Sequence, residues 1–356
     1  MDLLVLNENF ETIFVLDTYE SLIWVDKFAE PGTFEIYTRV TDDIVNYCKP
    51  NYYLVNNDSE HVMIIEDISI ESNVETGDKI KIVGRSLESI LDRRIVWSQT
   101  NIDGNLQSGV QTLINNAIIS PSIAGRAISN FIFEQAPQTE TAITALEMEH
   151  QYTGDNLLEV ITSLCEEKKI GFKITLNDQN QFVFRLYSGV DRSYAQDTLP
   201  YVVFSPSYDN VINSNFLEKN SITKNVALVG GEGEGTSRIT ETVGTETGLL
   251  RREVFVDARD IRKESLNPTK YKAKLASKGK DSLAEINKDR ESFDGKCDTT
   301  LGLYVYGRDF FMGDIVQMAN EYGMEASSRI TEFTWSYSTS GFETYPTFEP
   351  VENSTT

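Results

Sequence analysis

Alternating apolar and polar side chains are the main pattern of the first hundred residues. In the run 33–40, Phe34 and Ile36 alternate with Glu35 and Tyr37, as in a strand with one face on a core and the other in water. Seven runs of this kind lie at residues 3–6, 12–16, 21–25, 33–40, 52–56, 61–70 and 79–83, separated by turn-forming residues. Short strands at a spacing of roughly 8–12 residues predict a β sandwich or barrel over residues 1–97.

The pattern changes to a helical one after Gly84, which ends the last of these strands. Ser86 is expected to cap a short helix, and Glu88 lies in its first turn, where a negative charge complements the helix dipole. Leu87, Ile90 and Leu91 form one apolar stripe at helical spacing.

Three further residues close this segment. Arg93 and Arg94 lie in the last helical turn, where positive charge complements the dipole. Trp97 follows and is expected to anchor the next part of the chain. The stretch 84–97 therefore predicts a structural joint between a strand and a helix, without a chemical function of its own.

Residues 98–195 predict a compact α+β insert. The run 110–119 has helical spacing and stops at Pro121, and a second helix is expected after a cap at Asp155. Strands at 172–176 and 181–187 flank the turn 177–180 and predict a hairpin.

The rest of the chain returns to β patterning, with one helix. Strands are expected at 202–204, 226–229, 249–257, 301–306, 314–318 and 328–337, and residues 349–356 are expected to be disordered. A long mobile loop is predicted at 230–248, and a helix at 268–291 that Gly279 interrupts. Five lysines lie on this helix, at positions 270, 272, 274, 278 and 280. Either they form a solvated helix face or they dock on an acidic neighbouring subunit.

Charge narrows the possible partners. The chain of 356 residues has 32 Lys and Arg against 55 Asp and Glu, a formal net charge of −23. This excess disfavours binding to nucleic acid or to an anionic membrane surface. The N-terminal residues lack the basic start of a signal peptide, and no apolar run approaches a membrane span, so synthesis in a cytoplasm and no membrane insertion are expected.

No cofactor, metal or catalytic site is predicted. The turn 230–235 contains Gly230, Gly231, Gly233 and Gly235, but it lacks the Lys of a phosphate-binding loop and carries two glutamates. The two histidines have no ligand at metal-binding spacing, and no Ser or Cys lies in a nucleophile motif. The three cysteines, at positions 48, 165 and 297, are expected to be buried free thiols.

Several motifs together resemble the ReqiPepy-type siphovirus tail protein family, whose members are tail hub or tail-associated proteins. The first is Gly84-Arg-Ser-Leu-Glu-Ser-Ile-Leu-Asp-Arg-Arg-Ile-Val-Trp97, which contains Arg85. Others follow in the order of the family: residues 225–235 with Arg238, residues 252–260, residues 306–316 with Asp309, Gly313 and Asp314, residues 329–334 and residues 346–348. The resemblance runs from residue 84 to residue 348 and leaves the first β block uncovered.

The resemblance implies an α+β, mainly β fold like that of phage baseplate hubs and type VI secretion spike proteins. Two tail-tube-like β domains would span residues 1–97 and residues 196–230 with 298–350, with the insert at 98–195. Residues 231–297 would pack on the insert, and 351–356 would be a flexible tail. The named Gly, Arg, Trp and Asp residues of the motifs are candidates for structural or interface roles, with Arg85, Arg93 and Arg94 able to pair with acids across a subunit boundary or to compensate helix-end charge.

The family also implies a function in the virion. A homotrimeric ring at the tail tip would join a sixfold tail tube to a threefold tip and would let genome DNA pass without binding it. Its partners would be the distal tail protein, the tail tube or tape-measure protein, and other tip or receptor-binding proteins. A cell-wall-degrading tail lysin and a receptor-binding or carbohydrate-binding adhesin are the alternatives.

Overall fold

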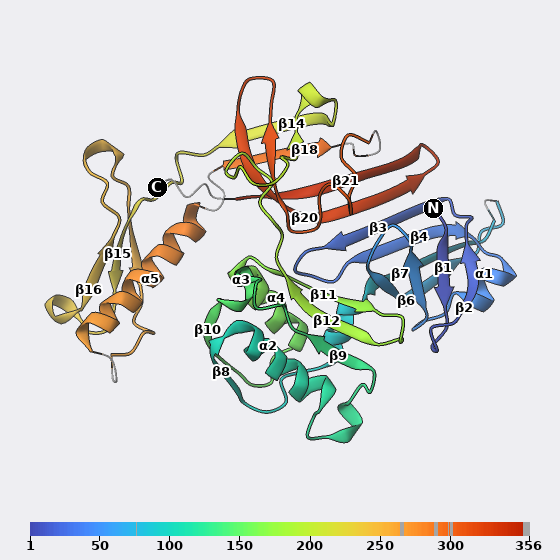
Figure 1. The fold of residues 1–356 in the computed structure, drawn as a ribbon, viewed down its shortest axis with the longest axis horizontal. Coiled ribbons are helices and arrows are strands. Elements are labelled where there is room, and N and C mark those ends of the chain that lie inside the picture. The colour runs from blue at the N-terminus through green and yellow to red at the C-terminus, as the bar shows by residue number, and fades with distance from the viewer. Residues whose placement is uncertain (76, 264–266, 288–290, 298, 300–301, 352–356) are drawn as a thin grey trace. The chain divides into compact units, whose positions relative to one another are not determined.

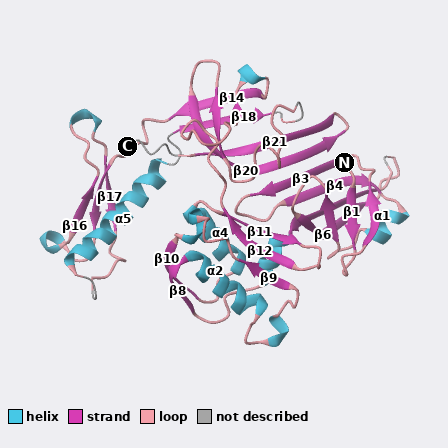
Figure 2. Ribbon diagram, viewed as in Figure 1, coloured by secondary structure: helices cyan, strands magenta, loops and turns pink. Residues whose placement is uncertain are grey.

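The computed structural model describes residues 1–75, 77–263, 267–287, 291–297, 299 and 302–351. The chain divides into two compact units, one of residues 1–213 with 296–349 and one of residues 214–295 with 350–356. Strands predominate in the first unit, whose helices are concentrated in the insert, and the second unit contains one long helix over Pro268–Asn287 (Figure 2). The mainly β fold with an α/β insert, predicted from the sequence, is confirmed.

A large sheet of the first unit contains the N-terminal strands and the strands near the C-terminus (Figure 1). Its order is β13-β19-β20-β3-β4-β7-β6-β5-β1-β2, and β21 pairs with β20. The N-terminal elements are β1 (Leu3–Leu6), β2 (Thr12–Leu16), β3 (Ser21–Lys27), β4 (Thr33–Arg39), α1 (Asp42–Tyr47), β5 (Tyr53–Asn56), β6 (Val62–Glu71) and β7 (Lys79–Ser86).

The predicted alternation sets which face of this sheet is buried. In β3, Leu22 and Trp24 are fully buried, whereas Ile23 between them is 44% exposed. In β4, Phe34 and Ile36 are buried on the same side. Antiparallel sheets commonly pack one face on a core and leave the other to solvent, and these strands do so.

Strands from later in the chain extend the same sheet. They are β13 (Val203–Phe204), β19 (Ile315–Ala319), β20 (Glu325–Ser338) and β21 (Gly341–Pro350), with the 3-10 helix η4 (Pro206–Tyr208) after β13. β20 pairs antiparallel with β3, and Trp335 lies opposite Trp24. Strands assigned from the sequence to two different β domains are therefore continuous in one sheet, which no local pattern predicts.

Two expectations for this region differ from the structure. Residues 302–306 form no strand, although Tyr306 makes an isolated bridge to Phe310, and residue 301 lies outside the described residues. β21 was not predicted and takes in residues 349 and 350, which were expected to be disordered; residues 352–356 lie outside the described residues.

The insert packs helices against two small sheets. The 3-10 helix η1 (Leu87–Arg93) leads into it. Its own elements are β8 (Thr100–Asn105), α2 (Leu106–Ile114), the π-helix η2 (Asn115–Ile119), the 3-10 helix η3 (Ala124–Arg126), β9 (Phe131–Glu134), α3 (Thr141–Thr144), β10 (Glu147–Tyr152), α4 (Leu157–Lys168), β11 (Gly171–Leu176) and β12 (Phe182–Tyr187). β10 pairs with β8, and β11-β12-β9 form a three-stranded sheet. The predicted hairpin is β11–β12, with Phe172 opposite Leu186.

One hydrophobic core joins this insert to the N-terminal strands. It includes Val62 and Ile64 of β6, the stripe of η1, and buried residues of α2, α4, β11 and β12. Leu87, Ile90 and Leu91 are all buried, as their helical spacing predicts. The helix that carries them is a 3-10 helix, however, and its start differs from the expectation.

The expected caps were wrong at two helices. The hydroxyl of Ser86 makes no cap to η1 and instead accepts a hydrogen bond from the Gly32 amide at 2.7 Å. At α4 the cap is Asn156, whose side-chain oxygen accepts from the amides of Leu158 and Glu159, while Asp155 accepts from the Thr153 amide. Asn and Asp are both strong caps, so adjacent candidates are hard to separate in sequence.

The second unit is a three-stranded sheet with one helix on it. It contains β15 (Val226–Gly230), β16 (Thr240–Val243), β17 (Glu253–Asp257) and α5 (Pro268–Asn287), with the 3-10 helices η5 (Gly235–Ser237) and η6 (Gly248–Leu250). The sheet order is β16-β15-β17. β14 (Val211–Glu218) and β18 (Glu291–Cys297) form a separate two-stranded ladder.

Helix α5 packs on the sheet through its buried side. Tyr271 and Leu275 are buried with Ala227 and Val229 of β15. Gly279 does not interrupt the helix as expected; a Cβ there would lie 2.6 Å from a methyl of Val229, so glycine permits close approach. The helix ends at Asn287, and residues 288–290 lie outside the described residues. The packing of residues 231–297 on the insert stays a prediction.

The segment 230–248, expected to be a long mobile loop, contains the strand β16. Its Thr and Val residues pair with β15, with Thr242 opposite Leu228. All three cysteines are buried, as predicted. Among the described residues, no helix is both long and apolar enough to cross a membrane.

Candidate functional site

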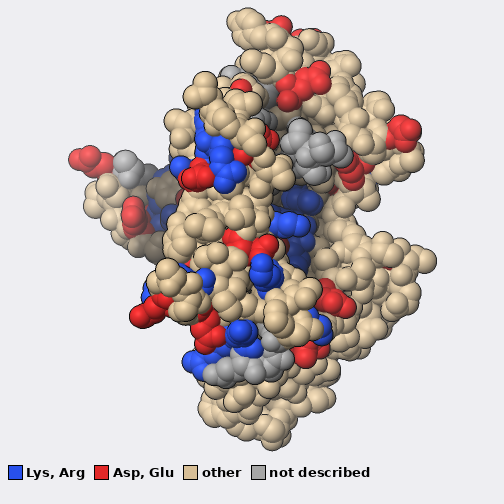
Figure 3. All heavy atoms as spheres, turned by 90° about the vertical axis from the view of Figure 1, so that its left-hand side faces the viewer, with Lys and Arg blue, Asp and Glu red and all other residues tan. Residues whose placement is uncertain are grey.

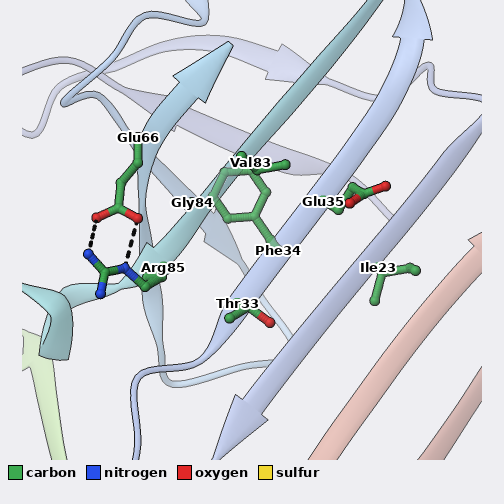
Figure 4. A pocket seen from close by; sticks show the side chains of 8 residues that line it. All are labelled: Ile23, Thr33, Phe34, Glu35, Glu66, Val83, Gly84 and Arg85. Atoms are coloured by element: carbon green, nitrogen blue, oxygen red, sulfur yellow. Dashed lines mark hydrogen bonds and ion pairs between the residues drawn. The ribbon is translucent and has the colours of Figure 1, made fainter. Parts of the chain in front are cut away.

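A hollow of about 340 Å³ lies on the solvent face of the large sheet, across β3, β4, β7 and β6 (Figure 4). Its lining includes Gly84 and Arg85, the first two residues of the motif 84–97. Its lining residues are Ile23, Thr33, Phe34, Glu35, Glu66, Val83, Gly84 and Arg85.

Gly84 shapes the floor of this hollow. A Cβ at this position would overlap the carbonyl oxygen of Ile64 and would lie 2.8 Å from a ring carbon of Phe34. The Phe34 ring, whose side chain belongs to the core, therefore lies directly beside the Gly84 backbone (Figure 4). Any larger residue would separate β7 from its neighbours.

A β-bulge places the acidic wall of the hollow. The register between β6 and β7 shifts between Ile65 and Asp67, so Glu66 is the extra residue. Bulges commonly redirect a side chain, and here Glu66 turns toward Arg85. Two parallel hydrogen bonds join the groups, from Nε to Oε2 and from Nη2 to Oε1, each 2.9 Å long.

Arg85 also reaches η1, the helix that leads into the insert. Its Nη1 donates to Oδ2 of Asp92 in η1 at 3.0 Å. The hydrogen bond with Glu66 is the main reason that the pKa of Arg85 is raised, and the hydrogen bond from Arg85 is the main reason that the pKa of Asp92 is lowered. Arg85 thus ties β6, β7 and η1 together inside one chain, and its pairing across a subunit boundary stays a prediction.

The open face around the hollow is a small apolar area ringed by paired charges. Ile23 is exposed at its centre, and Lys81 pairs with Glu35 at 2.8 Å. Lys27 pairs with Glu30 at 2.9 Å and with Glu332 of β20 at 3.2 Å. The hollow's lining contains no Ser, Cys, His or Lys side chain. This arrangement is suited to packing against another protein, since interfaces combine an apolar centre with a polar rim.

The second part of the signature forms a separate cluster. The Arg94 guanidinium donates to the carbonyl oxygen of Arg126 at 3.1 and 3.3 Å, and Arg126 donates to that of Ile95 at 2.7 Å. The Arg126 guanidinium lies over the Trp97 ring, 5.3 Å from its centroid. Trp97 is 57% exposed, and its role as an anchor for the residues that follow stays a prediction. The structure brings Arg94 and Trp97 together through Arg126, while Arg93 is exposed beside them.

The glycine-rich turn is a tight bend closed by Arg238. Its guanidinium donates to the carbonyl oxygens of Gly230 and Gly231 and to Asp257 of β17, the last at 2.7 Å. A Cβ at Gly230 would lie 2.7 Å from that guanidinium. The turn is therefore filled by the chain's own cation.

Gly233 and Gly235 supply the unusual backbone of the same turn, with φ of +105° and +54°. Only a three-residue 3-10 helix follows them, in place of the longer helix whose N-terminus a phosphate site needs. This geometry favours a structural role for the turn over nucleotide binding.

Near the C-terminus, the two predicted acidic residues Asp309 and Asp314 have different environments and different partners. Asp314 is buried and pairs with Nε of Arg192 at 2.8 Å, while also accepting from the amides of Val190 and Phe311. Asp309 accepts from the Val305 amide at 2.8 Å, and the hydrogen bond with its neighbour Arg308 lowers its pKa.

Gly313 lies between these two acids in sequence. Its φ is +86°, and a Cβ there would overlap the ring of Phe28. Its carbonyl oxygen accepts a hydrogen bond from Nη1 of Arg329 at 2.8 Å. The segment 309–314 is therefore a structural turn that holds β19 beside the insert's last residues.

A buried charged network was not predicted from the sequence. His61 Nδ1 lies 3.1 Å from Oε1 of Glu88, and both residues are almost fully buried. Burial alone would lower the pKa of His61, but the carboxylates of Glu88 and Asp26 raise it to about 9. Asp26 is buried too and accepts from the Trp24 indole at 2.9 Å.

This network joins the N-terminal strands to the insert. Glu88 accepts a hydrogen bond from the amide of Ile174 in β11 at 2.7 Å, 86 residues away in sequence. Burial would raise the pKa of Glu88, but His61 and the hydrogen bonds lower it. The one sequence signal for this network is that Glu88 lies on the same short helix as the apolar stripe that is buried. Its partners His61 and Ile174 are too far away in sequence for any local pattern to predict them.

The described residues contain no group of three or more His, Cys, Asp or Glu side chains that could hold a metal ion. His150, the other histidine, lies 3.3 Å from Glu167 at the surface.

The five lysines of α5 are exposed, as a solvated helix face requires. Lys272 pairs with Glu241 of β16 at 3.1 Å, and Lys278 lies 3.9 Å from Asp260. On this side of the molecule, basic and acidic side chains are interspersed (Figure 3). The second unit has 15 basic and 15 acidic residues in the sequence, so the first, with 17 and 40, carries the whole net charge of −23.

Comparison with known proteins decides the family. The family model of the Siphovirus ReqiPepy6 Gp37-like protein matches residues 2–348. The chain belongs to this Gp37-like family. The match includes the first β block, so the resemblance extends further than the motifs from residue 84 onward indicated. No curated protein sequence matches the chain.

Solved structures similar to this Gp37-like chain are phage tail proteins. The tail protein from Neisseria meningitidis MC58 is similar over 99% of this chain and 96% of its own, with 13% identity and a TM-score of 0.62. Prophage tail protein gp18 from Listeria monocytogenes EGD-e is similar over 100% and 96%, with 13% identity and a TM-score of 0.60.

A chain of a VgrG complex has a similar fold at a lower TM-score. A chain of the Francisella PdpA-VgrG complex is similar over 98% of this chain and 57% of its own, with 10% identity and a TM-score of 0.53. At these identities the likeness shows the fold alone, and the fold is that of phage tail proteins.

Proposed function

We propose that this Gp37-like chain is a non-enzymatic hub protein of the tail tip. Three copies form a closed ring that joins the sixfold tail tube to a threefold tip. The observation that carries the proposal is the similarity to phage tail proteins over nearly the whole of both chains. A chain with the same extent as these proteins has room for the same kind of assembly role.

The partners follow from that position. The ring contacts the distal tail protein on its outside, the tail tube or tape-measure protein above, and other tip or receptor-binding proteins below. The open face around Ile23 and Arg85 supports packing, because its charges are already paired and its centre is apolar. Lys270 and its neighbours on α5 can dock on an acidic face of another copy, since the first unit carries all the net negative charge.

The same charge distribution supports a passage for DNA. Acidic residues of the first unit partly line the channel, where they repel the phosphate backbone and keep DNA from sticking during ejection. DNA therefore transits and is not bound. A neutral or basic channel in the assembled ring would contradict this part of the proposal.

The location can be tested by labelling. A gold-labelled antibody against the chain should mark only the tip of purified tails, and quantitative mass spectrometry of those tails should give three copies for each tip. Labelling along the tube or absence from the virion would overturn the proposal.

The alternatives predict other activities of the isolated chain. A tail lysin would clear host cell wall in a gel assay. An adhesin would bind host cells as the isolated chain, without the rest of the tail. Clearing of the cell wall by the isolated chain would overturn the hub proposal. Binding of host cells by a chain that is absent from the tail would also overturn it.

A further inference from the structure

Trp97 and Arg126 line one side of a second hollow, of about 200 Å³, and Arg94 and Arg93 are close enough to Arg126 for their charges to interact. The hollow is in the insert, between the end of η1 and the π-helix η2. Its lining is formed by Val96, Trp97, Ser98, Gln99, Thr100, Leu113, Asn116, Ala117, Ser122 and Arg126. This site is separate from the open face of the large sheet described above.

The positive charge at this place is unpaired in an acidic protein. Within the described part of the chain, Arg93, Arg94 and Arg126 make no ion pair with an acid; Arg94 and Arg126 donate only to backbone carbonyls. Burial and the like charges of Arg126 and Arg93 lower the pKa of Arg94. By contrast, Arg85 and Arg192 are each held by carboxylates. A negative ligand would relieve the repulsion among the three guanidinium groups.

Trp97 adds a flat apolar surface. Of the three tryptophans, Trp24 and Trp335 are 0% and 4% exposed, whereas Trp97 is 57% exposed. Arg126 lies over its ring, a contact that fixes the orientation of both groups. Indole rings offer both a face for packing and an N–H donor to a ligand that is partly wet.

The remaining wall is polar. Asn116 comes from the π-helix, a rare element that often marks functional sites, and Ser98, Gln99 and Ser122 come from the flanking loops. Amides and hydroxyls of this kind can donate to and accept from ligand hydroxyl groups. The hollow is smaller than the roughly 300–1,000 Å³ of pockets that enclose drug-sized ligands, so it suits one ring of a longer chain.

We propose that this hollow binds an anionic saccharide. One sugar ring packs on Trp97, its hydroxyls bond to Asn116 and the neighbouring loops, and its carboxylate or phosphate is held by Arg126. Long nucleic acid is disfavoured by the net charge of −23, which repels an extended polyanion. An acidic peptide lacks the ring that matches the exposed indole.

Quenching of tryptophan fluorescence by acrylamide tests the proposal on the full chain, because only Trp97 is accessible to the quencher. The probes are trigalacturonate, a glycosylated glycerol-phosphate oligomer, neutral maltotriose, a hexaglutamate peptide and inorganic phosphate. We expect at least one of the two anionic saccharides to protect Trp97, with maltotriose, the peptide and phosphate weaker by about 10-fold or more.

Variants assign the contact. Arg126→Gln should weaken binding of the protecting saccharide about 10-fold, which corresponds to one charge-assisted contact. Trp97→Ala, followed by calorimetry, should weaken it to a similar extent. Arg39→Gln is the matched control, because Arg39 is 79% exposed and pairs with Glu20 on the large sheet; its binding should equal that of the unaltered chain.

Three results would overturn the proposal. The first is that neither anionic saccharide protects Trp97, and the second is that hexaglutamate or phosphate protects as well as they do. The third is that Arg126→Gln binds normally but no longer forms rings, which would assign the cluster to an acidic segment of a second copy. Ring formation by the unaltered chain is measured separately, so failure here leaves the hub proposal standing.

Discussion

At the scale of single residues, two features decide which substitutions the chain tolerates: close contact with a neighbouring backbone, and charge that is buried in the core. Gly84 lies where a side-chain carbon would overlap the carbonyl oxygen of Ile64. His61 and Glu88 place charges in the core, where each depends on the other. Two substitutions separate these effects from general sensitivity to mutation.

Gly84→Ala should lower the free energy of unfolding by about 2–3 kcal/mol, because the added methyl group forces β7 away from β6 and Phe34. Denaturant unfolding of the two proteins measures the difference. Gly125→Ala is the matched control, since nothing lies within 4 Å of a Cβ there and its stability should hardly change. Equal stability of Gly84→Ala and the unaltered chain would contradict the packing described for the hollow.

His61 should make stability depend on pH. Its folded pKa of about 9 exceeds the ordinary value of 6.5, so its contribution is full below pH 6.5 and is lost as pH rises through 9. His61→Gln should therefore cost roughly 3 kcal/mol at pH 6 and much less at pH 10.

Unfolding curves of His61→Gln and the unaltered chain across this pH range measure the cost. His150→Gln, at the partly exposed second histidine, should show no such trend. A cost that stays constant between pH 6 and pH 10 would mean that His61 is not charged in the folded chain.

At the scale of elements, sequence periodicity predicted those features that depend only on residues close together in the chain. The β11–β12 hairpin and the buried stripe of η1 follow from neighbouring residues, and both are present. The pairing of β20 with β3 and the bulge at Glu66 depend on strands far apart or on register, which a local pattern does not encode. For the same reason the sequence placed Arg85 in the site but did not predict its contacts with Glu66 and Asp92.

The second unit offers a test of one element's anchoring. The Tyr271 hydroxyl of α5 accepts from the Glu232 amide at 2.8 Å and donates to the carbonyl oxygen of Ile261 at 3.0 Å. Tyr271→Phe leaves both partners unpaired and should destabilise this unit by about 1–3 kcal/mol.

Hydrogen exchange resolved by residue should then show faster exchange in β15 and α5, with the insert unchanged. Tyr208→Phe, at a tyrosine that is 51% exposed, serves as the control and should alter neither region. Uniformly faster exchange throughout the chain would contradict a local anchoring role.

At the scale of the whole molecule, charge is divided unevenly along the chain. The first unit carries a net charge of −23 and the second is neutral with a lysine-bearing helix. Like charges of this size would repel neighbouring copies, so a ring needs contacts that offset the repulsion. The proposed contacts are the open face of the large sheet and the exposed side of α5.

The central claim is a threefold ring at the tail tip. Electron cryomicroscopy of isolated tails, reconstructed without imposed symmetry, tests it most directly. We expect three copies of this chain around one channel, with acidic residues of the first unit facing the lumen, below a sixfold tube. Six copies, an open arrangement, or a tip density that this chain does not fit would contradict it.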